Sequence, residues 1–122
     1  MHEMGIAMQV VEIAIASIPA DMQGAKVARI NLKVGKLSAV VPDSLRFCFE
    51  IAAQDTPLVD ADLNIEEVPV VIHCRDCNTQ WIISEPAFSC RKCNSGSITI
   101  VSGRELDIDS IEIVDKDTLD AD

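Results

Sequence analysis

The spacing of hydrophobic and polar residues changes several times along the chain, and each change predicts a different element. Over residues 4–19 apolar side chains recur at steps of three and four, which is typical of one face of an α-helix. That face is predicted to carry Met4, Met8, Val11, Ile15 and Ile18. Core packing is the favoured role of this methionine-bearing stripe, ahead of a soft-metal or partner groove. Pro19 predicts the end of the helix.

From residue 27 the apolar period becomes two, which predicts a half-buried strand that ends at Gly35. Its inward side is predicted to carry Ala28, Ile30, Leu32 and Val34. Helical spacing returns over residues 40–54, where Pro42 suits the first helical turn. The inner face of this second helix is predicted to carry Leu45, Cys48, Phe49 and Ala52.

Two more strands complete the predicted sheet. One ends near Val68, and the other occupies residues 103–114, where a phase change near Asp109–Ser110 predicts a bulge. Two helices on a three-stranded sheet form an α+β fold, a two-layer sandwich. Residues 1–69 supply its first part and residues 103–114 its last strand. The acidic segment 115–122 is predicted to be a disordered tail.

Residues 70–102 form a separate unit inserted before the last strand. The unit has too few large apolar residues to build an independent core, so it needs a covalent or metal link. Cys74, Cys77, Cys90 and Cys93 provide one, in the pattern CxxC, twelve residues, CxxC. Two such knuckles can complete a tetrahedron of thiolates around zinc, and a closed site of this kind is structural. Iron held as in rubredoxin is the competing interpretation, because the same four thiolates suit it.

Composition narrows the possible functions. The formal net charge is −10, so nucleic acid and anionic membranes are not expected partners. No apolar run is long enough to span a bilayer and no secretory signal is visible, so we expect a cytoplasmic protein with reduced cysteines. No Ser/His/Asp set, Cys/His set or phosphate loop is present, so we do not expect an enzyme.

The first three residues carry a possible second metal site. The terminal amine, the backbone nitrogen of His2 and its ring Nδ1 can chelate one ion through a five-membered and a six-membered ring. Deprotonated amide nitrogens with an imidazole favour square-planar Ni(II) or Cu(II). Glu3 can add an amide nitrogen or a carboxylate.

Four motifs together resemble the HypA/HybF family, the nickel metallochaperones of [NiFe]-hydrogenase maturation. They are MHE at the start, GKLSAVVPDSLRFCFE, the paired CRDC and CRKC, and SGREL before the last strand. In this order they cover about residues 1–114. Some members carry a histidine beside each cysteine knuckle, whereas here His73 precedes Cys74 and Asn94 follows Cys93.

The resemblance implies that residues 1–69 form a nickel-binding domain, in which His2 holds Ni(II) with help from Met1 and Glu3. It also implies structural Zn(II) at the four cysteines of residues 70–102. Expected partners are a HypB-like nickel GTPase, the [NiFe]-hydrogenase large subunit and, in some organisms, urease accessory proteins. A rubredoxin-like iron electron carrier and a zinc-stapled interaction adaptor are the alternative functions.

Overall fold

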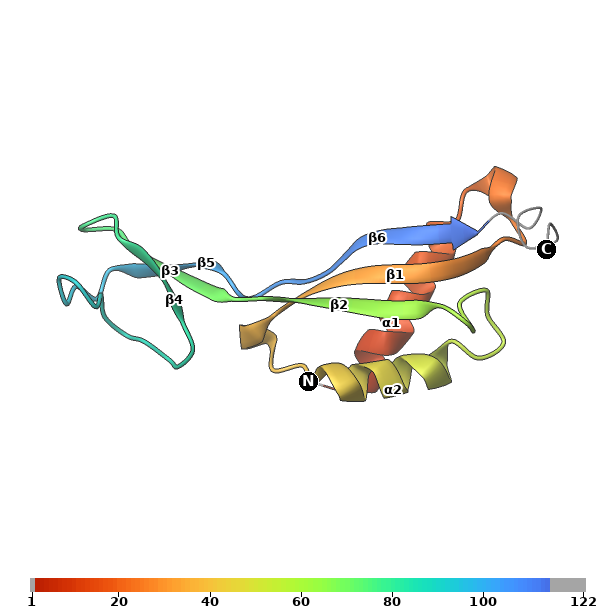
Figure 1. Cartoon of the computed structure of the whole chain (residues 1–122), viewed down its shortest axis with the longest axis horizontal. Helices are drawn as coiled ribbons and strands as arrows, with labels where there is room; N and C mark the ends of the chain where they lie inside the picture. Colours follow the sequence, from red (N-terminus) through yellow and green to blue (C-terminus); the bar gives the residue numbers. More distant parts are fainter. Residues whose placement is uncertain (1, 115–122) are drawn as a thin grey trace. The chain divides into compact units, whose positions relative to one another are not determined.

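The computed structural model describes residues 2–114. The predicted acidic tail, 115–122, lies outside the described residues, as does Met1. The elements, in chain order, are α1 (Glu3–Ala16), the 3-10 helix η1 (Ala20–Met22), β1 (Lys26–Gly35), the 3-10 helix η2 (Lys36–Ser38), α2 (Pro42–Ala52), β2 (Asp62–Val68), β3 (Val70–Cys74), β4 (Gln80–Ile83), β5 (Ile98–Ser102) and β6 (Leu106–Val114) (Figure 1). In the part of the chain that the structure covers, neither α-helix is long and apolar enough to cross a membrane.

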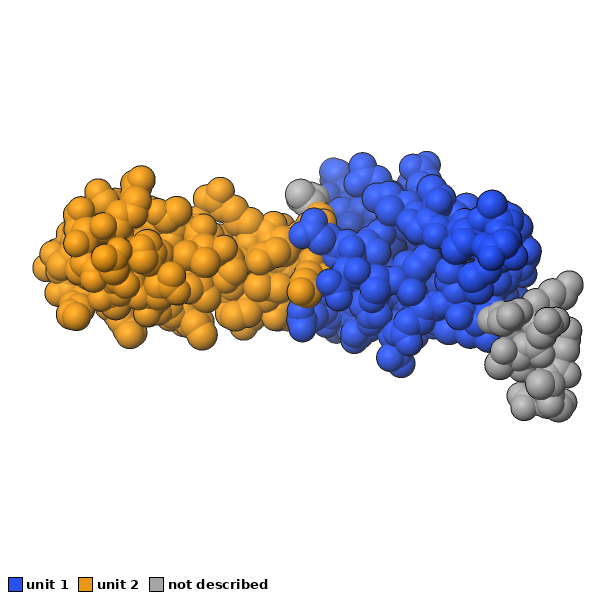
Figure 2. Space-filling model, turned by 90° about the horizontal axis from the view of Figure 1, so that it is seen from above, with its two compact units in different colours: residues 1–32, 40–66, 107–122 blue, residues 33–39, 67–106 orange. Residues whose placement is uncertain are grey.

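The chain divides into two compact units (Figure 2). Unit 1 comprises residues 1–32, 40–66 and 107–122, and unit 2 comprises residues 33–39 and 67–106. Each unit has a three-stranded sheet, with strand order β2-β1-β6 in one and β4-β3-β5 in the other.

The β2-β1-β6 sheet carries both α-helices on one face (Figure 1). This confirms the predicted α+β class, with two helices on a three-stranded sheet. On α2, Pro42 occupies the first turn, and Leu45 and Phe49 are buried as predicted. The opposite face of the sheet is polar: Asn31 donates to Ser110 Oγ at 3.0 Å and to Glu112 Oε2 at 3.1 Å, and accepts from Asn64 at 2.9 Å.

The inner face predicted for the first helix was wrong in part: Val11 and Ile18 are buried as predicted, but Met8 and Ile15 are not. The residues that α1 buries are Ile6, Ala7, Val10, Val11 and Ala14. Met8 is 55% exposed, Ile15 is 39% exposed, and the helix ends at Ala16, before the predicted end. Apolar residues surround most of this helix, so spacing alone did not identify its inner side. The fully buried Ala7 and Ala14 have small side chains that let α1 lie close to its neighbours.

The inward direction of Ala28 was also predicted wrongly. Val27 and Ile30 are buried, while Ala28 and Arg29 between them are both exposed. Strict alternation is therefore interrupted within β1. The same happens in β6, where consecutive Asp109 and Ser110 are exposed and the half-buried positions change phase, as the sequence predicted.

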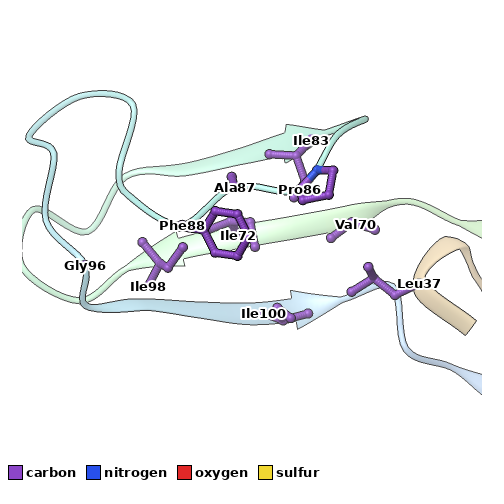
Figure 3. A pocket seen from close by; sticks show the side chains of 10 residues that line it. All are labelled: Leu37, Val70, Ile72, Ile83, Pro86, Ala87, Phe88, Gly96, Ile98 and Ile100. Carbon is purple, nitrogen blue, oxygen red and sulfur yellow. The ribbon is translucent and has the colours of Figure 1, made fainter.

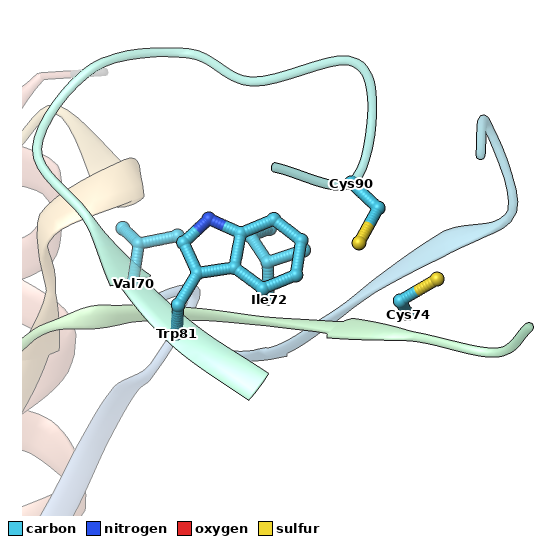
Figure 4. Packing of buried hydrophobic residues seen from close by; sticks show 5 residues of the cluster. All are labelled: Val70, Ile72, Cys74, Trp81 and Cys90. Atoms are coloured by element: carbon cyan, nitrogen blue, oxygen red, sulfur yellow. The ribbon is translucent and has the colours of Figure 1, made fainter. Parts of the chain in front are cut away.

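Unit 2 is built on an antiparallel sheet in which β3 is central. Trp81 lies opposite Ile72 across the β3–β4 pair, and Val70 lies opposite Ile83. The Trp81 ring packs over Val70 and Ile72, with the side chains of Cys74 and Cys90 further along the sheet (Figure 4). This small cluster is the core of the unit.

Candidate metal centre

Two knuckles of the same backbone geometry bring the four cysteines together. In the first, the N–H of Cys74 donates to Thr79 O at 2.9 Å, and the N–H of Asn78 donates to Cys74 O at 2.9 Å. The second knuckle repeats this pattern: the N–H of Cys90 donates to Ser95 O, and the N–H of Asn94 donates to Cys90 O, each at 2.8 Å. Both knuckles therefore turn the chain back after the second cysteine.

Each knuckle depends on an asparagine whose backbone role was not predicted from the cysteine spacing. Asn78 has φ of 60° and Asn94 has φ of 62°, in the left-handed region that asparagine tolerates better than most residues. The signal was present in the sequence, because both CxxC pairs are followed directly by asparagine, as CRDCN and CRKCN.

The sulfur atoms form a compact cluster. All four Sγ atoms lie within 4.8 Å of one another. Two of the Sγ–Sγ distances join the two knuckles: Cys74 to Cys93 and Cys77 to Cys90, each 3.6 Å. A tetrahedron with Zn–S bonds of about 2.3 Å places its sulfurs about 3.8 Å apart, so the cluster fits a four-thiolate zinc site.

The surroundings of the thiols shift their pKa values in opposite directions. Hydrogen bonding with the side chain and the backbone of Thr79 lowers the pKa of Cys77 to about 6. The Ser95 backbone favours the Cys93 thiolate, but desolvation and the neighbouring cysteines outweigh it and raise the pKa of Cys93 to about 12. Desolvation opposes ionisation of Cys90, yet the N–H groups of Cys93 and Lys92 leave its pKa lowered. Neighbouring thiolates repel one another because they carry like charges. A divalent cation bound between them offsets this repulsion and stabilises all four thiolates.

His73 does not belong to this cluster. It alternates with the buried Ile72 and Cys74 on β3, so its side chain lies on the other face of the strand. Its Nδ1 lies 3.2 Å from Gln80 Nε2. Within residues 2–114, the group of potential metal ligands that the structure brings together contains cysteines alone.

The predicted nickel residues lie at the start of α1. His2 is the N-cap residue and is exposed, and Glu3 is the first helical residue and is half-buried. The backbone oxygen of His2 accepts from the N–H of Ile6 at 3.3 Å. Met1 lies outside the described residues.

An apolar groove of about 430 Å³ lies in unit 2, with Pro86, Ala87 and Phe88 on one side and β3 and β5 on the other (Figure 3). It is lined by Leu37, Val70, Ile72, Ile83, Pro86, Ala87, Phe88, Gly96, Ile98 and Ile100. None of these residues has a titratable side chain, so the groove offers no acid, base or nucleophile for catalysis.

A family model and several known proteins match nearly the whole chain. The family model described as "Hydrogenase/urease nickel incorporation, metallochaperone, hypA" matches residues 1–113. The hydrogenase maturation factor HypA of Desulfosudis oleivorans is 61% identical over 113 residues, which is 93% of this chain and 98% of that protein. The protein of the same name from Desulfatibacillum aliphaticivorans is 57% identical over 119 residues, 98% of this chain and 92% of that protein.

A solved structure is similar in fold. The solution structure of the Ni metallochaperone HypA from Helicobacter pylori has a TM-score of 0.66 and 24% sequence identity, covering 95% of this chain and all of that one. Together with the family match, this confirms the resemblance that the four sequence motifs predicted. The chain belongs to the HypA family of hydrogenase and urease nickel-incorporation metallochaperones, which are maturation factors and not enzymes.

Proposed function

We propose that this chain binds one Ni(II) at its N-terminus, through His2 with Met1 and Glu3, and delivers it to the [NiFe]-hydrogenase large subunit. A HypB-like GTPase is the proposed partner in delivery, with urease accessory proteins as further recipients where urease is present. Zn(II) at Cys74, Cys77, Cys90 and Cys93 is proposed to be structural.

The position of His2 at the N-cap of α1 is the observation that carries the nickel proposal. The first N–H groups of a helix have no partner within the helix. Replacing the amide protons of His2 and Glu3 by a metal therefore breaks no helical hydrogen bond, and the bond from Ile6 to His2 O remains. Two deprotonated amides also neutralise a dication, so the positive end of the helix dipole does not repel the loaded site.

The zinc proposal is supported by the size of the core in unit 2. Five residues are buried there as one cluster, and two of them are cysteines. Four thiolates complete the coordination of zinc and leave no position for a substrate, so such a site supplies folding free energy and no catalysis.

Nickel titration of untagged protein with its native N-terminus tests the proposal. His2→Ala should abolish stoichiometric Ni(II) binding, because it removes the imidazole that closes the six-membered chelate ring. Zinc content and melting temperature should not change. His73→Ala is the matched control, since these are the two histidines of the chain, and it should bind nickel as the wild type does.

The same titration separates the alternative functions. An iron electron carrier would be coloured as isolated, whereas the proposed protein is colourless and holds one zinc. Zinc without any stoichiometric nickel would favour the interaction adaptor. Unchanged nickel binding in His2→Ala would place the nickel site elsewhere.

A further inference from the structure

The four cysteines of the metal centre differ in their accessibility. Cys74 and Cys90 are fully buried, Cys77 is half-buried and Cys93 is exposed. Cys74 and Cys90 belong to the core cluster around Trp81, which shields them from solvent. A reagent that arrives from solution therefore meets Cys93 first.

Hydrogen bonds to the sulfurs do not by themselves set Cys93 apart, because the Ser95 backbone also favours its thiolate. Cys90 Sγ accepts from the backbone N–H groups of Lys92 at 3.3 Å and Cys93 at 3.4 Å. Cys77 Sγ lies 3.3 Å from the hydroxyl of Thr79. The two backbone donors hold Cys90 Sγ in position, and exposure to solvent is what distinguishes Cys93 as the first sulfur to meet an electrophile.

The surroundings of Cys93 suit an anionic reagent. Arg91 and Lys92 immediately precede it and both are exposed, with the Arg91 guanidinium held 5.8 Å from the centre of the Trp81 ring. Small disulfides in reducing compartments, such as glutathione disulfide, carry carboxylates. These two cations are sequence neighbours of Cys93, and they outnumber the one carboxylate of the knuckles, Asp76, which accepts a hydrogen bond from Ser95. A local excess of positive charge raises the local concentration of such an anion.

The cluster also contains a partner that can complete the oxidation. Cys74 Sγ lies 3.6 Å from Cys93 Sγ, which is close to sulfur–sulfur contact. A disulfide requires about 2.0 Å between its sulfurs, so a shift of about 1.6 Å closes the bond. Cys90, in the same knuckle as Cys93, is held by its two backbone donors.

From this arrangement we infer that Cys93 is the site at which anionic low-molecular-weight disulfides attack the metal centre, and that Cys74 then forms a disulfide with it across the two knuckles. The inference rests on the proposed zinc site and is independent of the nickel site. It makes the zinc-bearing unit sensitive to oxidation through one defined cysteine.

The chemistry is two successive thiol–disulfide exchanges. With the proposed zinc bound, Cys93 would be held as a thiolate. Its sulfur attacks one sulfur of the small disulfide, a new S–S bond forms, and the other half leaves as a thiolate that takes a proton from water. The Cys74 thiolate then attacks Cys93 Sγ and expels the second small thiolate. Two cysteine sulfurs lose two electrons in total, and the small disulfide gains them. Cys77 and Cys90 alone hold a metal ion far more weakly than the complete set.

The test uses the full-length, zinc-loaded wild type with less than one equivalent of glutathione disulfide. Peptide mapping after acid quenching identifies the first mixed disulfide and the final cysteine pairing, while a chromophoric chelator records zinc release. We expect the first adduct on Cys93, the final bond between Cys74 and Cys93, and one zinc released for each bond formed. A first adduct on Cys77, or a final bond between Cys90 and Cys93, would overturn the inference.

Lys92→Glu tests the role of charge without removing a metal ligand, and Lys36→Glu is the matched control in the same unit. Lys92→Glu should slow the reaction with glutathione disulfide several-fold but leave the reaction with neutral hydroxyethyl disulfide unchanged. If Lys92→Glu and Lys36→Glu reacted with the anionic disulfide at equal rates, the claim that the Lys92 charge attracts this reagent would be wrong. Protein isolated without zinc would overturn both this inference and the proposed zinc site, whereas zinc-loaded protein that reacts elsewhere overturns the inference alone.

Discussion

Gly35 allows two distant segments of unit 2 to lie in direct contact. Gly35 donates to Glu105 O at 2.6 Å, and Leu37 donates to Gly103 O at 2.8 Å. A Cβ placed on Gly35 would lie 2.0 Å from Gly103 O. These residues belong to the GKLS and SGREL motifs, so two sequence motifs that lie far apart in the chain form one structural element.

Gly35→Ala should therefore destabilise unit 2 strongly. The added methyl group meets backbone atoms that cannot rotate away, so we expect a loss of about 3 kcal/mol, at the upper end of the cost of overpacking. Urea unfolding followed by the fluorescence of Trp81, the one tryptophan of the chain, measures it. Gly96→Ala is the control, because a Cβ there meets nothing within 4 Å. Equal midpoints for the two variants would contradict the close contact.

The metal centre was the part of the site that sequence predicted best. Cysteine spacing alone predicted the cluster of four sulfurs that the structure shows. Spacing could not predict which sulfur is exposed, because burial of Cys74 and Cys90 depends on their packing with Trp81. The nickel-binding role of Met1, His2 and Glu3 stays a prediction, because a metal chelated by the first residues of the chain requires no buried side chains.

The two α-helices show how far hydrophobic spacing can predict an element. In α2 the charged residues Asp43, Arg46 and Glu50 are all exposed, and Leu45 and Phe49 were assigned correctly to the inner face, although Phe47 and Ile51 are exposed too. In α1 the acidic residues are Glu3 and Glu12, and apolar residues occupy most other positions. The choice of face then depended on the fit of Ala7 and Ala14 against neighbouring elements, which is a property of the folded state.

The strand-rich unit around the cysteines should fold only with its metal. Cys77→Ala removes one of four ligands, and the binding free energy of the metal is the folding free energy of a unit with so small a core. We expect loss of zinc, loss of the buried Trp81 fluorescence signal and rapid hydrogen exchange in β3, β4 and β5. The helical circular dichroism signal should persist, because α1 and α2 belong to unit 1.

Cys48→Ala is the matched control for that experiment, since Cys48 lies on α2 outside the cluster. It should retain zinc and the Trp81 signal. Simultaneous loss of helical signal and Trp81 signal in Cys77→Ala would show that the two units unfold as one.

Charge is distributed unequally over the whole molecule. Among residues 2–114, unit 1 carries twelve carboxylate side chains and three lysine or arginine side chains, whereas unit 2 carries four and six. The strong negative charge therefore belongs to the unit that begins with the proposed nickel residues. Electrostatic attraction to a basic partner surface increases the association rate, and this effect weakens as the salt concentration rises. It does not require tight binding, which would slow the release of nickel.

Association with the proposed HypB-like GTPase should accordingly weaken with salt, because exposed charges are screened beyond about 8 Å at physiological ionic strength.

Since nickel must pass at short range, we expect the contact to include His2, Glu3 and the first turn of α1. Calorimetry should show that Glu3→Ala weakens binding about two- to fivefold, as for one exposed ion pair. Asp21→Ala, which removes the same charge beyond the other end of α1, should bind as the wild type does. A chain ending at Val114 should also bind normally. Loss of binding in that shortened chain, with Glu3→Ala unaffected, would place the interface away from the nickel site.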